Sequence, residues 1–146
     1  MGLDMYLNAK RFLWHDEEKL ATDLKDNFPD LPETMRIKEV TIEALYWRKA
    51  NAIHKWFVDN VQGGVDECQE TDVSLAQLEK LLEVIEQVLD DPSKVHDLLP
   101  PTAGFFFGSK DVDQWYWDDL KQTHSKLQEL FTRDWKNWDF SYRASW

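Results

Sequence analysis

The stretch of residues 74–91 constrains the fold more than any other part of the chain. Its apolar residues recur every three or four positions and form a stripe about 100° wide on a helix. They are Leu75, Leu78, Leu81, Leu82, Ile85, Val88 and Leu89. Ser74 followed by Gln77 has the form of a capping box, and Pro92 predicts the helix end. Because a helix with one apolar face must bury that face, we expect a fold built from packed helices.

A second helix is predicted over residues 46–64, ending at the glycine pair Gly63 and Gly64. With the helical repeat, its apolar face comprises Tyr46, Ala50, Ile53, Phe57 and Val61. The margin of that face comprises Trp47, Asn51, His54 and Val58. A side chain at such a margin is packed by the core and still reaches a ligand. This helix is therefore the first place to expect a binding site.

Strands are predicted at both ends of the chain. Residues 2–14 alternate apolar and polar side chains, and residues 135–146 alternate aromatic and polar ones, which is typical of half-buried strands. We expect these two strands to pair. Residues 35–45 fit neither period cleanly and are interpreted as a short strand that leads into the second helix. Residues 15–33 are charged and contain two prolines, which indicates a surface connection with one helical turn over residues 17–24.

Two further helical segments and one aromatic run complete the chain. Residues 93–99 predict two helical turns, and residues 111–133 predict a third long helix. Residues 104–108 read Gly-Phe-Phe-Phe-Gly, and three adjacent rings must be covered on both faces or form one wall of an apolar cleft. The patterns together predict one helix-dominated α+β domain over residues 1–146, with three main helices packed on a small sheet formed by the N- and C-terminal strands.

The acidic residues gather in one part of the chain. The net charge is −11, and residues 59–91 carry ten acidic residues and one basic residue, Lys80, a local charge of −9. Such a surface repels a phosphate backbone, which argues against direct nucleic-acid binding. Two interpretations remain open. The acidic segment is a solvated face that keeps the protein soluble, or it is a nucleic-acid mimic that inhibits a basic host protein.

Familiar catalytic and metal-binding motifs are absent from the sequence. It has no Gly-rich phosphate loop, no HExxH, no CxxC and no G-x-S-x-G pattern. Asp111 and Asp113, with Asp118 and Asp119, could hold Mg²⁺, but acidic residues at a helix start already stabilise the helix dipole. The acidic neighbours of Cys68 disfavour a reactive thiolate. We therefore predict no catalytic residue, no metal and no cofactor.

The single cysteine excludes an internal disulfide, and no apolar run suggests a secretion signal or a membrane span. A cytoplasmic protein is the default expectation. The candidate ligand-binding residues combine donors for an anion with flat rings for stacking. They are Trp47, Arg48, Asn51, His54, Lys55, Phe106 and Trp115. For His54 a packed position at the core edge is the alternative, and for Arg48 and Lys55 it is a solvated surface.

Several blocks of the sequence resemble a family of small uncharacterised proteins of phages and prophages. The blocks are MGLDMYL, YWRKANAIHKWFVDNVQ, LLPPTAGFFFG and the closing Ser145-Trp146. The resemblance implies a phage accessory role in the host cytoplasm, such as countering host defence or adjusting host metabolism. It carries no activity or site residue. The family's common form is shorter after the first strand, which makes residues 16–32 a local elaboration.

Three functions are compatible with these observations. The first is a non-enzymatic protein that binds a small anionic, nucleotide-like ligand in an aromatic and basic pocket, for example a host immune messenger. The second is an acidic inhibitor that binds a host protein through residues 59–91. The third, an enzyme with His54 as general base, lacks a visible nucleophile or metal set. No membrane partner is expected, and a homo-oligomer is left open.

Overall fold

The structure, a computed structural model, describes residues 2–103 and 111–146. In this part the protein is an α+β fold with five α-helices and one four-stranded antiparallel sheet of order β2-β1-β4-β3. The strands are β1 (Asp4–Phe12), β2 (Glu39–Arg48), β3 (Thr71–Val73) and β4 (Asp139–Ser145). The helices are α1 (Glu18–Lys25), α2 (Asn51–Asn60), α3 (Leu75–Asp90), α4 (Val95–Leu98) and α5 (Gln114–Leu130). None of these helices is long and apolar enough to cross a membrane.

The predicted pairing of the two chain ends is confirmed. β1 and β4 run antiparallel from the Asp4–Ser145 pair to the Lys10–Asp139 pair. The sheet is nevertheless larger than the predicted pair of end strands. β2, which contains most of the strand predicted over residues 35–45, joins the free side of β1, and β3 joins the free side of β4. β3 lies in the acidic segment, where three residues are too few to show a period in the sequence.

The predicted helix over residues 46–64 is wrong at its start. β2 continues through Arg48, and α2 begins only at Asn51. Trp47 pairs with Met5 of β1 and points into the core, so the strand period holds to the end of β2. Lys49 then adopts a positive φ of 60°, which a helix does not allow. The α2 helix ends at Asn60, before the glycine pair.

The other helix predictions agree with the structure. The Ser74 hydroxyl accepts from the Gln77 backbone N–H at 3.1 Å, and the Gln77 side chain accepts from the Ser74 N–H at 2.9 Å, which is the predicted capping box of α3. A short 3-10 turn and α4 occupy the segment predicted to make two helical turns. The three longest helices are α2, α3 and α5, with α1 and α4 as shorter additions.

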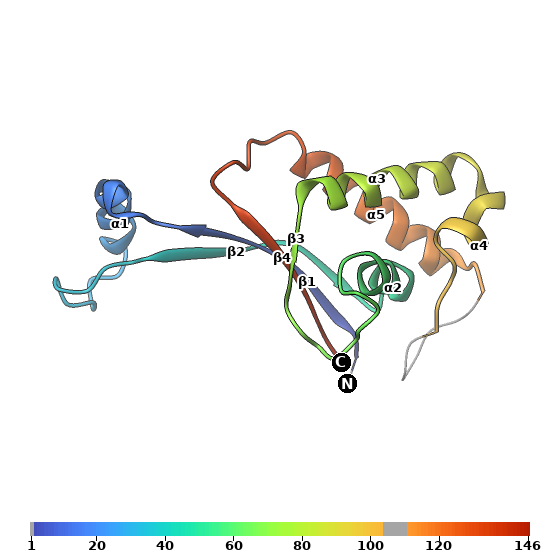
Figure 1. Cartoon of the computed structure of the whole chain (residues 1–146), viewed down its shortest axis with the longest axis horizontal. Helices are drawn as coiled ribbons and strands as arrows, with labels where there is room; N and C mark the ends of the chain where they lie inside the picture. The colour runs from blue at the N-terminus through green and yellow to red at the C-terminus, as the bar shows by residue number, and fades with distance from the viewer. Residues whose placement is uncertain (1, 104–110) are drawn as a thin grey trace.

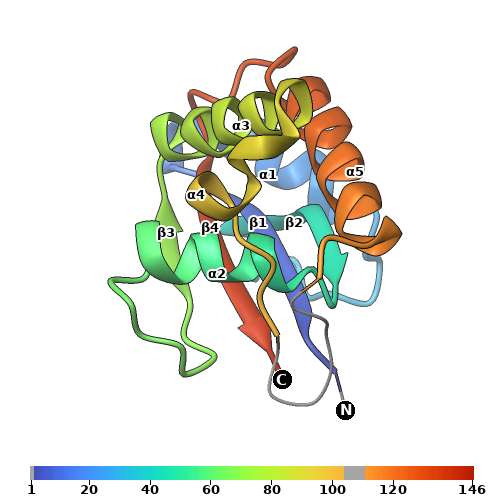
Figure 2. The same ribbon diagram turned by 90° about the vertical axis from the view of Figure 1, so that its right-hand side faces the viewer.

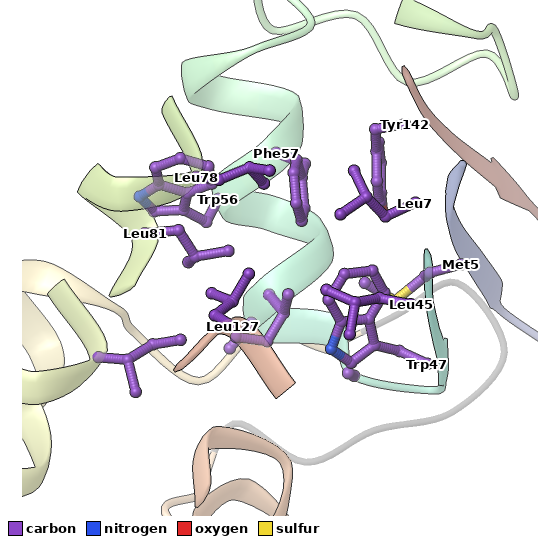
Figure 3. Packing of buried hydrophobic residues seen from close by; sticks show 14 of the residues in the cluster. Met5, Leu7, Leu45, Trp47, Trp56, Phe57, Leu78, Leu81, Leu127 and Tyr142 are labelled. Atoms are coloured by element: carbon purple, nitrogen blue, oxygen red, sulfur yellow. The ribbon is translucent and has the colours of Figure 1, made fainter. Parts of the chain in front are cut away.

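The helices α2 to α5 cover one side of the sheet (Figures 1 and 2). Burial alternates along β1, where Leu7 is buried between the half-buried Tyr6 and Asn8. The core lies between this face and the helices. Phe57 of α2 stacks on the Tyr142 ring at a centroid distance of 3.9 Å, and it meets Trp47 and Trp56 edge to face (Figure 3).

Beyond the Lys10–Asp139 pair, β1 and β2 continue together without β4. They carry α1 and the connection that follows it, and this unit projects away from the other helices (Figure 1). We call residues 11–40 the arm. The arm contains the segment that the sequence indicated as a surface connection, and its predicted helical turn is a 3-10 turn followed by the eight-residue α1.

Candidate functional site

A cleft of about 560 Å³ lies between the end of β2 and the start of α5. Three segments form its walls. Residues 48–53 contribute the β2–α2 turn and the first turn of α2, residues 101–102 follow α4, and residues 111–120 contribute the first half of α5. The cleft therefore depends on contacts between parts of the chain that are distant in sequence.

One wall of the cleft is positive. The Arg48 side chain is 63 % exposed, and its Nε lies 3.9 Å from an Asp4 carboxylate oxygen, a loose pair that leaves the guanidinium open to water. Lys49 follows it along the same wall. The N-cap residue Ala50 supplies no side-chain bond to the first N–H groups of α2, and residues 51–53 of this first turn line the cleft. The helix dipole places partial positive charge there.

The opposite wall is aromatic and acidic. Trp115, in the first turn of α5, is 77 % exposed, so its ring offers a free stacking surface. Asp113 caps α5 by accepting the Tyr116 N–H at 3.0 Å, which gives this carboxylate a structural role. The buried Tyr116 hydroxyl donates to the Leu99 carbonyl at 2.6 Å, and burial raises its pKa to about 12.

Asp119 lies one helical turn after Trp115 and lines the same wall. Burial raises its pKa to about 6 from 3.8, and the charges of Asp118 and Asp113 add to the effect. Within the described residues its carboxylate has no hydrogen-bond partner that would oppose this shift. A carboxylate with a raised pKa in a cleft is a typical mark of a functional site. The sequence drew attention to Asp119 only as a weak magnesium ligand.

The structure gives no support to that magnesium site. In the described part of the chain, no group of three or more His, Cys, Asp or Glu side chains is arranged to hold a metal ion. The acidic residues at the start of α5 instead act on the helix end and on one another.

The raised pKa of Asp119 predicts that stability falls as the pH rises from about 4 to about 6. In this range the folded state holds a proton that the unfolded state has released, so raising the pH favours unfolding. An uncharged Asp119→Asn variant is therefore expected to be more stable than the parent at neutral pH, by about 1 kcal/mol after allowance for solvent screening of a half-buried group. Urea unfolding of the parent and of Asp119→Asn at about pH 4 and at neutral pH measures the difference in the free energy of unfolding.

The control for this experiment is Glu129→Gln, an exposed carboxylate in the last turn of the same helix. Its stability is expected to follow that of the parent at every pH. A neutral-pH difference of zero between Asp119→Asn and the parent would contradict the burial of a charge at this position.

His54 does not line the cleft. It is 8 % exposed, with Nδ1 2.7 Å from the Tyr142 hydroxyl and Nε2 3.0 Å from Oδ2 of Asp66. Burial raises the pKa of Tyr142 well above its usual value, so the hydroxyl keeps its proton. An ionised Asp66 carboxylate can only accept, which makes Nε2 the protonated ring nitrogen, and in this tautomer Nδ1 accepts from the Tyr142 hydroxyl. The Nε2–H then donates to Asp66, whose other oxygen accepts the Trp146 indole N–H at 3.1 Å. His54 thus joins α2 to β4 and to the acidic connection.

The remaining candidate residues lie in different environments. Trp47 is buried, and its indole N–H donates to the Thr123 hydroxyl at 2.8 Å. Lys55 is exposed and pairs with Asp59 one turn further along α2. Phe106 and the aromatic run around it lie outside the described residues. Of the seven candidates, the cleft brings together Arg48, Asn51 and Trp115.

The structure gives internal partners to several carboxylates of the acidic segment. Besides Asp59 and Asp66, Glu70 pairs with Lys10 and accepts the Ser141 hydroxyl, and Glu86 lies 3.2 Å from His124. The exposed carboxylates of α3 are Glu79, Glu83 and Asp90, of which Glu83 pairs with Lys80. No specific contact favours the inhibitor function, which stays a prediction.

Comparison with known proteins gives no relative for this chain: no family model, no curated protein and no solved structure matches it. The resemblance to phage proteins therefore rests on the sequence blocks alone, and the phage origin stays a prediction.

Proposed function

We propose that the protein binds a small anionic ligand with a flat ring, such as a nucleotide, in the cleft between β2 and α5. One observation carries this proposal: a single cleft holds Arg48, Lys49 and the start of α2 on one side and the exposed Trp115 ring on the other. Its volume of about 560 Å³ lies within the usual range of small-molecule sites.

The two walls fit different parts of a nucleotide. A phosphate is attracted to the guanidinium of Arg48 and to the positive end of the helix dipole at the start of α2. A base stacks on Trp115, and its ring N–H or amino donors face the Asp119 carboxylate one helical turn away. The cleft lining also holds three aspartates, Asp111, Asp113 and Asp119, and this division places them at the uncharged end of the ligand.

We propose binding rather than catalysis because His54, the general base that the sequence suggests, uses both ring nitrogens inside the protein. The phage resemblance and this cleft together support a proposed role: the protein sequesters a host nucleotide messenger in the cytoplasm. Native mass spectrometry of protein purified directly from cells tests the proposal, because a stoichiometric bound nucleotide would be retained and weighed.

Substitutions in the cleft are expected to weaken nucleotide binding. Trp115→Ala removes a stacking surface worth about 1–3 kcal/mol per base, and Arg48→Ala removes a charged hydrogen-bond donor of similar value. Each variant is expected to bind roughly tenfold more weakly or worse than the parent. Titration calorimetry with the nucleotide found by native mass spectrometry, or with a panel of nucleoside monophosphates and cyclic nucleotides, measures the change.

Lys55→Ala is the matched control, since Lys55 is a basic residue of α2, seven positions after Arg48, that lies outside the cleft. Its affinity is expected to equal that of the parent. Equal loss in Lys55→Ala and Arg48→Ala would indicate a general electrostatic attraction rather than a site, and unchanged binding in both cleft variants would place the ligand elsewhere.

A further inference from the structure

The aspartates at the start of α5 differ in whether their carboxylates are already used. Asp113 caps the helix, and Asp118 accepts the Gln114 side-chain amide at 2.7 Å. Asp111 also interacts with another group. Asp119 lines the cleft, and in the described part of the chain no hydrogen-bond donor reaches its carboxylate. Its two oxygens are therefore acceptors that a ligand in the cleft can use.

The half-buried Asp119 carboxylate gains from a ligand that donates hydrogen bonds to it. Burial takes water away from the charged form and raises the pKa to about 6, and the charges of Asp118 and Asp113 act in the same direction. At neutral pH the group is still mostly ionised, so it only accepts. Because a polar group that is removed from water without a partner costs free energy, donors on the ligand are favoured at this point and acceptors are repelled.

The position of Asp119 determines which part of a nucleotide meets it. Asp119 and Trp115 are four residues apart on α5, which places their Cβ atoms about 5–6 Å apart on one side of the helix. Both line the cleft, and the start of α5 faces the β2–α2 turn that carries Arg48 and Lys49 (Figure 2). A phosphate is drawn to that positive turn, so a base that stacks on Trp115 turns one edge toward Asp119.

The common bases differ in what their edges offer to two acceptor oxygens. Guanine carries two adjacent donors, the N1–H and the 2-amino group. Adenine and cytosine each place one amino donor beside a ring nitrogen that accepts, and uracil places its N3–H between two carbonyl oxygens. An acceptor that faces a carboxylate is repelled by it. Guanine is therefore the one of these four bases that gives both Asp119 oxygens a donor.

We propose that the cleft selects guanine nucleotides, with the Asp119 carboxylate accepting hydrogen bonds from the N1–H and the 2-amino group of a base that stacks on Trp115. This inference rests on the proposed function and names the base that the cleft prefers. Asp119 is then the residue that determines specificity, while Arg48 contributes affinity for the phosphate of any nucleotide.

Titration calorimetry of the full chain with three nucleoside monophosphates tests the proposal. They are GMP, IMP, which keeps the N1–H but lacks the 2-amino group, and AMP, which has neither donor. At about pH 8 the Asp119 carboxylate is ionised, since its pKa is about 6. The parent is expected to bind GMP roughly tenfold more tightly than IMP and roughly a hundredfold more tightly than AMP, because each step loses a hydrogen bond to a charged group.

Asp119→Asn is expected to remove this preference without loss of the fold. A carboxamide offers one acceptor and one donor, which match the N1–H and O6 of guanine as well as the 6-amino group and N1 of adenine. GMP and AMP are then expected to bind within about threefold of each other. Asp118→Asn is the matched control, because it removes the same charge from the neighbouring residue, which lies outside the cleft lining. It is expected to keep the preference of the parent.

The outcomes separate this inference from the proposed function. A parent that binds GMP and AMP equally would overturn the selection of guanine and leave the cleft as a nucleotide site. A parent that binds none of the three nucleotides would contradict both. A preference that survives in Asp119→Asn, or that is lost equally in Asp118→Asn, would also overturn the inference, because it would not depend on the two acceptor oxygens of Asp119.

Discussion

Replacing Phe57 with alanine is expected to lower the free energy of unfolding by about 3–5 kcal/mol, a large part of the stability of a domain of this size. The ring is fully buried and stacks on Tyr142 with an interplanar angle of 6°. It also meets Trp47 and Trp56 edge to face at 5.8 and 5.4 Å. Truncation leaves a cavity at the junction of α2, β2 and β4 that rigid neighbours cannot fill. Urea unfolding followed by tryptophan fluorescence measures the loss.

Trp115→Ala is the control for this substitution, because it truncates an aromatic ring that is exposed. Its stability is expected to stay within about 0.5 kcal/mol of the parent. All variants are compared at one protein concentration, since any self-association would make apparent stability depend on concentration. A loss below about 1 kcal/mol for Phe57→Ala would mean that Phe57 does not sit at the centre of the core.

The sequence predicts an element well where the whole signal for that element lies within its own residues. The stripe and capping box of α3 need no information from elsewhere, and their prediction is confirmed to the residue that caps the helix, Ser74. The alternation in β1 and β4 is equally local. The pairing of the two chain ends follows because half-buried strands need partners for their backbone groups.

The boundary between β2 and α2 could not be predicted in this way. Apolar Tyr46 and Ala50 fit a helical repeat, while the burial of Leu45 and Trp47 fits a strand. The choice is made by β1, whose residues from Asp4 to Phe12 pair with β2. A bulge next to Leu45 shifts the register and disturbs the alternation that would have revealed the strand.

The candidate site residues also divide into those that the local sequence places correctly and those whose surroundings depend on distant parts of the chain. Arg48, Asn51 and Trp115 were chosen for chemistry that a ligand needs, and they line one cleft. Trp47 has the same chemistry but has its partner in Thr123, far along the chain. Asp119 was not chosen as a ligand residue because its raised pKa depends on burial, which the sequence around it does not show.

Tyr142→Phe is expected to lower the free energy of unfolding by about 1–3 kcal/mol, although it removes one oxygen atom. The hydroxyl is buried and 2.7 Å from Nδ1 of His54, so its removal leaves a buried acceptor without a donor. Tyr46→Phe is the matched control. Its hydroxyl bonds to Asp4 at the surface, where water replaces a lost partner, and a change within about 0.5 kcal/mol is expected.

A double-mutant cycle of His54→Ala and Tyr142→Phe separates the structural role of His54 from a role in binding. If His54 acts through Tyr142 and Asp66, the two substitutions are not additive, and the coupling free energy is about 1 kcal/mol or more. Nucleotide affinity of the folded His54→Ala variant is then expected to match the parent, because the cleft is lined by other residues. The opposite pattern, additive stability with lost affinity, would return His54 to the ligand site and remove the reason to regard the protein as a binder without catalysis.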